Sequence, residues 1–186
     1  VYPESKKIYE QETQHELELI DMLNDKKLLY AGAIVLGMND ALVELTGTLS
    51  GIALAFDKSL TVGLTGLIMG IAASLSMAGS AYFEAKENPS DDINPLIYSL
   101  YTGVSYILTT TILVLPFFIF ETMAYSLIMM FISAFLAIIS YNFYISVAKD
   151  LSFSKRVIQM SAITFGVALI SFGIGYVVKY YFGIEI

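Results

Sequence analysis

The stretch LIYSLYTGVSYILTTTILVLPFFIF, residues 96–120, decides the fold class, because it carries no charged side chain over its whole length. A run of about 20 mostly apolar residues is long enough for a helix to cross the roughly 30 Å hydrocarbon core of a membrane. Asn94 followed by Pro95 has the pattern of a helix cap and a first helical residue. Pro116 predicts a kink near the end of this helix.

Four further stretches outward from this run are also long and apolar, and short polar connections separate them: 28–56, 60–83, 122–147 and 157–182. The pattern predicts an all-α, polytopic membrane protein with five transmembrane helices. We expect two regions, a cytoplasmic helix over 1–27 and a five-helix transmembrane domain over 28–186.

The composition excludes several classes of protein. Hydrophobic residues make up 56% of the 186 residues and charged residues only 15%, whereas soluble domains carry about 25% charged residues. A net charge of -7 argues against nucleic-acid binding, which requires clustered Lys and Arg. Because the chain has no cysteine, it forms no disulfide and no thiolate metal site.

The basic residues predict the orientation of the chain, since Lys and Arg collect on the cytoplasmic side of membrane proteins. The side with the amino terminus would hold eight of them: Lys6, Lys7, Lys26, Lys27, Lys86, Lys149, Lys155 and Arg156. The opposite side would hold only Lys58 and Lys179. We therefore expect a cytoplasmic amino terminus and an external carboxyl terminus.

Two acidic residues, Asp40 and Glu44, fall near the middle of the first span. Each carboxylate at the bilayer centre costs roughly 2.5–3.5 kcal/mol on insertion scales. Their i,i+4 spacing places both on one helix face, together with a stripe of small residues suited to close helix contact: Gly37, Gly47 and Gly51. Two stacked acids without a basic partner predict a path for cations or protons. The alternative is a pair of protonated carboxyls that are hydrogen-bonded inside the bundle.

The second span adds softer candidate ligands. Met69 and Met77 lie on one helical face that ends at Glu84. Thioethers favour softer metals than carboxylates do, so a mixed site fits ferrous or manganous ions better than calcium. Methionines at helical spacing are also common in plain packing, and that reading stays open here.

The amino-terminal segment carries the single histidine of the chain. Glu12 and His15 lie one helical turn apart, which is half of the Glu-x-x-His pattern of ferritin-like di-metal bundles. A solvated helix with an incidental histidine is the alternative. We also expect an upstream domain before Val1.

Two motifs resemble the vacuolar iron transporter family. Residues 38–43, MNDALV, followed by Gly47, are similar to its Asn-Asp-Gly-Leu-Val motif, and Ser76-Met77-Ala78 followed by Tyr82 resembles its Ser-Met-Ala motif. The resemblance extends from about Leu28 to the carboxyl end. The segment with Glu12 and His15 further resembles the last helix of the rubrerythrin-like domain that some members carry.

The resemblance implies a dimeric, proton-coupled exporter that moves Fe²⁺ or Mn²⁺ from the cytosol into a vacuole or out of the cell. Asp40 and Met77 would then be ligands of the translocated ion. Ala41 stands where the family has glycine, and Ala81 stands where it has an acidic residue before the tyrosine. A gate ligand is therefore either missing or displaced to Glu84.

Three functions follow from these patterns. The first is a divalent-metal/proton antiporter, a homodimer in the plasma membrane or a vacuole-type membrane, with the metal as substrate and no organic cofactor. The second is a non-transporting membrane anchor for a ferritin-like metal-binding domain. The third is a passive cation channel, ranked last because the sequence lacks a repeated filter motif. Because no nucleophile–base pairing can be proposed, we expect no enzymatic activity in the membrane part.

Overall fold

The computed structural model describes residues 26–88, 93–149 and 151–182. Within these ranges the chain forms five helices and no strand: α2 (Lys26–Ile52), α3 (Ser59–Glu87), α4 (Pro95–Ile119), α5 (Met123–Lys149) and α6 (Phe153–Phe182). The all-helical prediction is confirmed for this part of the chain, with a helix at each of the five predicted spans. The expected helix over 1–27 lies almost entirely outside the described residues.

The start of α4 follows the predicted cap. The Asn94 side chain accepts hydrogen bonds from the backbone N–H groups of Leu96 and Ile97, and Pro95 occupies the first helical position. Pro95 suits this position because the first helical N–H has no partner within the helix.

At the other end of α4, soon after Pro116, serine side chains form hydrogen bonds with the last backbone carbonyls. Ser59, at the start of α3, donates to the Phe117 carbonyl at 3.0 Å and lies 2.6 Å from the hydroxyl of Ser126. Ser126, on α5, in turn lies 3.1 Å from the Phe120 carbonyl. Because the last carbonyls of a helix lack partners within it, these two serines tie α3, α4 and α5 together at this end.

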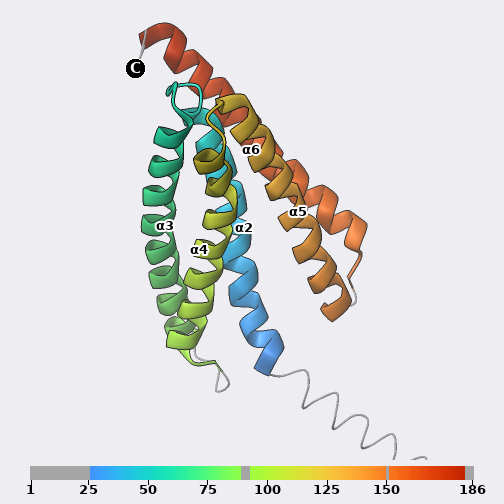
Figure 1. Ribbon diagram of the computed structural model, residues 1–186. Coiled ribbons are helices and arrows are strands. Elements are labelled where there is room, and N and C mark those ends of the chain that lie inside the picture. The colour runs from blue at the N-terminus through green and yellow to red at the C-terminus, as the bar shows by residue number, and fades with distance from the viewer. Residues whose placement is uncertain (1–25, 89–92, 150, 183–186) are drawn as a thin grey trace, which may run out of the picture.

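Helix α2 is the centre of the bundle and contacts each of the other four described helices. Its most extensive contacts are with α4 and α6, while α3 packs mainly on α4. Figure 1 shows α3 and α4 side by side on one flank of α2, and the α5–α6 pair leaning away from them toward the lower end of the view. The helices are therefore closely packed at the upper end and diverge at the end where α2 begins.

Glycines make the close contacts of α2. A Cβ on Gly37 would overlap the Thr102 carbonyl oxygen of α4, and a Cβ on Gly175 of α6 would overlap the Gly51 carbonyl oxygen. The predicted small-residue stripe therefore contacts two different helices, α4 before Asp40 and α6 after Glu44. Small residues permit such backbone approaches between helices.

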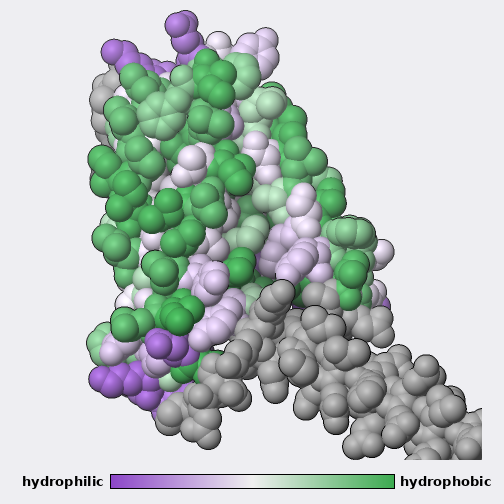
Figure 2. Space-filling model, turned by 60° about the horizontal axis from the view of Figure 1, so that its bottom comes forward, coloured by the Kyte–Doolittle hydropathy of each residue, from purple (hydrophilic) through white to green (hydrophobic). Residues whose placement is uncertain are grey.

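Four of the five described helices are long and apolar enough to cross a membrane: α3, α4, α5 and α6. Helix α2 has 27 residues but is less apolar, because Asn39, Asp40 and Glu44 interrupt its middle. Figure 2 shows apolar side chains along the length of the bundle and hydrophilic ones gathered at its ends. This surface is that expected of a helical membrane protein.

Candidate functional site

Glu44 is held by a tyrosine from the neighbouring helix α4. The Tyr106 hydroxyl donates a hydrogen bond of 2.8 Å to Glu44 Oε2, and the Tyr106 side chain is fully buried. Glu44 itself is exposed on the single chain. Its carboxyl group is therefore fixed at one oxygen and open at the other.

Asp40 lies one turn away and lines a surface groove of about 440 Å³. The groove is built mainly by α2, and it also receives Glu84 from α3 and Tyr98 from α4. Three elements thus bring two predicted site residues, Asp40 and Glu84, to one hollow.

The donors in this region are hard oxygen atoms. Carboxylate, phenol and amide oxygens suit divalent ions such as Mn²⁺, and ferrous ion accepts them together with softer ligands. Among residues 26–88, 93–149 and 151–182, no group of three or more His, Cys, Asp or Glu side chains is close enough to hold a metal ion. Within the described residues of one chain, at most one other carboxylate is therefore close enough to share a metal ion with Asp40. Neutral oxygens or water would have to supply the remaining ligands.

The methionines do not join Asp40 in its groove. Met77 is partly buried and packs against the core cluster, whose members include Ala41, Leu45 and Tyr106. Neither Met77 nor Met69 is among the described residues that line the Asp40 groove. Met77 therefore contributes to the packing of the core and does not line the groove of Asp40. The last pair of predicted site residues, Glu12 and His15, lies outside the described residues.

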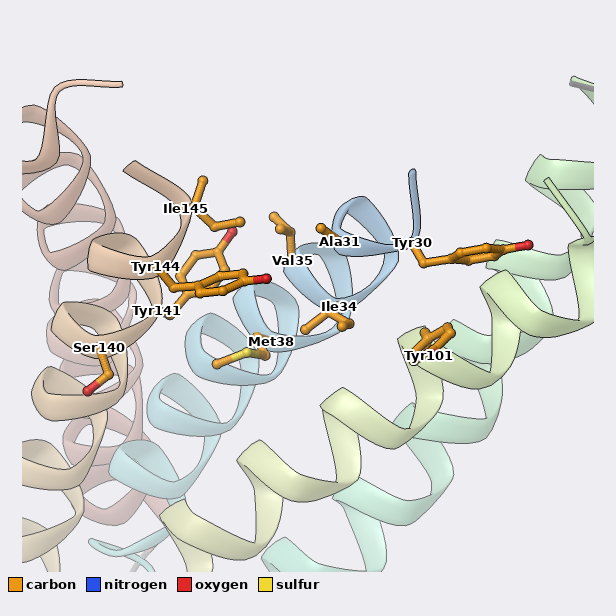
Figure 3. A pocket seen from close by; sticks show the side chains of 10 residues that line it. All are labelled: Tyr30, Ala31, Ile34, Val35, Met38, Tyr101, Ser140, Tyr141, Tyr144 and Ile145. Carbon is orange, nitrogen blue, oxygen red and sulfur yellow. The ribbon is translucent and has the colours of Figure 1, made fainter. Parts of the chain in front are cut away.

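Another cavity, of about 590 Å³, lies between α2, α4 and α5. Figure 3 shows Tyr141 and Tyr144 of α5 close to the α2 side chains of Val35 and Met38. Neither Asp40 nor Glu44 lines this cavity. It reflects the divergence of α5 from α2 and does not belong to the carboxylate site.

Sequence reasoning missed Tyr106, Tyr98 and Asn39 as parts of the site. The signal for Tyr106 was present, because it falls in the middle of an uncharged span, where a buried phenol requires a hydrogen-bond partner. Tyr98 gave a weaker signal, since tyrosines near helix ends are common at membrane interfaces.

The fold and surface together define the class of the protein: its described part is an all-helical bundle, four of whose helices have the length and apolarity of membrane spans. No protein-family model matches the chain, and no curated protein matches it. What the protein does is therefore inferred from the residues and geometry of the site.

Proposed function

We propose that the chain is a proton-coupled exporter of divalent metal ions, Fe²⁺ or Mn²⁺, with α2 as a fifth membrane span. The amino terminus would be cytoplasmic, and the host would be a plasma membrane or a vacuole-type membrane. Asp40 and Glu44 would bind either the metal ion or protons, so that one replaces the other during transport. Glu84 would assist the capture of the metal ion at the cytoplasmic end.

One observation carries the proposal: the central helix of an apolar bundle presents two carboxyl groups one turn apart, one in a groove with Glu84 and one bound to Tyr106. Carboxylates in such a position oppose membrane insertion. Their presence is explained if a cation passes them. Because metal binding needs deprotonated ligands, the same groups would release metal when they take up protons.

The exposure of Glu44 supports self-association. An exposed carboxylate at mid-membrane depth would face lipid at a cost of roughly 2.5–3.5 kcal/mol. A second copy packed on this face would remove the cost. A two-fold arrangement would also double the ligands, because each copy contributes the same residues to an isologous interface.

The proposal is tested with purified protein in proteoliposomes, by following Mn²⁺ movement driven by a proton gradient. We expect Asp40→Asn to reduce this transport at least tenfold, because the amide cannot exchange a proton for the metal. Asp57→Asn is the matched control, since Asp57 is an exposed carboxylate in the α2–α3 connection. Transport at the unaltered rate by Asp40→Asn would refute the assignment.

The same experiment separates the proposal from the alternative functions. A non-transporting anchor for a ferritin-like domain predicts no Mn²⁺ movement in any variant. A passive channel predicts Mn²⁺ flux without proton counter-movement, which a pH-sensitive dye inside the vesicles would reveal.

A further inference from the structure

A second polar cavity, of about 240 Å³, lies between α2, α5 and α6. Its polar lining comes from all three helices: Asn39, Asn142, Arg156 and Gln159. Asn39 and Val43 separate it from the Asp40 groove, because these two residues line both hollows. The described residues that line this cavity include an arginine and no carboxylate.

The arginine of this cavity is held in a fixed orientation. Arg156 Nε donates to Asn142 Oδ1 at 3.2 Å, and Asn142 in turn donates to the Ile138 carbonyl at 2.8 Å. Asn142 is 1% exposed, so the anchor of the guanidinium is rigid. Nε is directed at Asn142, and the guanidinium also lies close to the Tyr141 hydroxyl. The rest of its donor fork is left for a ligand, and such a fork matches phosphate geometry.

Asn39 of α2, another residue that lines the cavity, offers a buried acceptor. Asn39 Oδ1 is buried and has no hydrogen-bond partner among the residues that the structure describes. Buried polar atoms are nearly always paired with protein, water or ligand. The Tyr141 hydroxyl is also buried without such a partner, and it lies close to Asn39 and Arg156. A ligand that fills this cavity would therefore bring a hydroxyl group to these polar atoms beside its anionic group.

We infer that this cavity binds a phosphate ester that bears a free hydroxyl, with the phosphate on Arg156 and the hydroxyl donating to Asn39. Phosphatidylglycerol has this headgroup chemistry, and free glycerol phosphate shares it. Basic pockets between transmembrane helices are suited to anionic headgroups. Arg156 lies in the first turn of α6, and Lys155 beside it is exposed, so both charges directly precede the predicted span 157–182.

The apolar surroundings favour the lipid source. Ile163 lines the cavity and is 58% exposed on α6, and Ile158 on the same helix is 68% exposed. Acyl chains can lie along these side chains while the headgroup enters the cavity. The inference does not depend on metal transport, because none of its contacts uses Asp40 or Glu44.

The test is thermal unfolding of the full chain in nanodiscs of phosphatidylcholine, compared with nanodiscs that also contain phosphatidylglycerol. Phosphatidylglycerol should raise the melting temperature by about 3 °C, as a binding energy near 1 kcal/mol does in a chain of this size. Arg156→Gln should abolish the rise. Lys179→Gln, which removes a positive charge at the far end of α6, should keep it.

Each remaining outcome is decisive. If free glycerol phosphate produces the same rise in phosphatidylcholine nanodiscs, the site binds the soluble ester. If Arg156→Gln keeps the full rise, or if neither probe stabilises the unaltered chain, the inference is wrong. If the Arg156–Asn142 contact is purely structural, Arg156→Gln should lower the melting temperature equally in both kinds of nanodisc. The rise caused by phosphatidylglycerol would then be unchanged. Arg156→Lys, which keeps the charge without the fork, should retain less than half the rise and provides a readout if Arg156→Gln does not fold.

Discussion

At the scale of single residues, the site depends on how a carboxyl group is held inside an apolar bundle. Tyr106 is buried and donates a hydrogen bond to Glu44, whereas Asp40 lines a surface groove together with Glu84. The two acids therefore have different surroundings although they lie one turn apart. We infer that Glu44 is the oriented member of the pair, held by Tyr106, and that Asp40 is the member that shares its groove with a second carboxylate.

Tyr106→Phe tests the orientation of Glu44 while keeping the aromatic ring in the core. A hydrogen bond to a charged group contributes about 1.5–3 kcal/mol, so its loss should raise the Mn²⁺ concentration for half-maximal transport by about ten- to a hundredfold. Tyr125→Phe is the control, because Tyr125 is 62% exposed on α5. Equal half-maximal concentrations for the two variants would show that the hydroxyl does not position the site.

At the scale of the helices, the sequence predicts where each helix lies along the chain. It does not predict which face of a helix packs against which neighbour. Long apolar runs and the Asn94–Pro95 cap predicted all five helices to within a few residues at most boundaries. The predicted first span runs to residue 56, but α2 ends at Ile52. Hydropathy continues past this point while the backbone turns, with Phe56 N–H bonded to the Ile52 carbonyl.

Which helix faces which could not be read from periodicity. The predicted glycine stripe of α2 contacts α4 before the two acids and α6 after them. Helix crossing angles cause this change of partner, and they depend on the packing of all the helices together. The same cause keeps Met77 against the core and out of the Asp40 groove.

The contact of Gly51 with Gly175 gives a prediction about α6. A glycine-to-alanine change in a helix interior usually stabilises by about 0.5–1 kcal/mol. Gly175→Ala should instead destabilise by about 1–3 kcal/mol, because the new methyl would overlap the Gly51 carbonyl oxygen.

The matched control for this change is Gly173→Ala on the same helix, where a Cβ meets nothing within 4 Å. Thermal unfolding in detergent should place Gly175→Ala below the unaltered chain and Gly173→Ala at or above it. If the two variants unfold at the same temperature, α6 does not pack on α2 through these glycines.

At the scale of the whole molecule, the surface is uneven in a way that suits assembly. Most of the bundle presents apolar side chains, as Figure 2 shows for one side, yet the Glu44 side chain is exposed on the central helix. Lipid can cover the apolar faces. The carboxylate face requires water or another protein surface.

Self-association through this face is open to a direct test, because the chain contains no cysteine. A single Thr48→Cys, one turn beyond Glu44 on α2, would lie near its symmetry mate if two copies pack with their carboxylate faces together. In native membranes, a short bis-maleimide should then link two chains. Ile128→Cys, 55% exposed on α5, should remain largely unlinked because that face would contact lipid. Linkage of Ile128→Cys alone would move the interface to α5 and leave Glu44 without the second set of ligands that the transport proposal gives it.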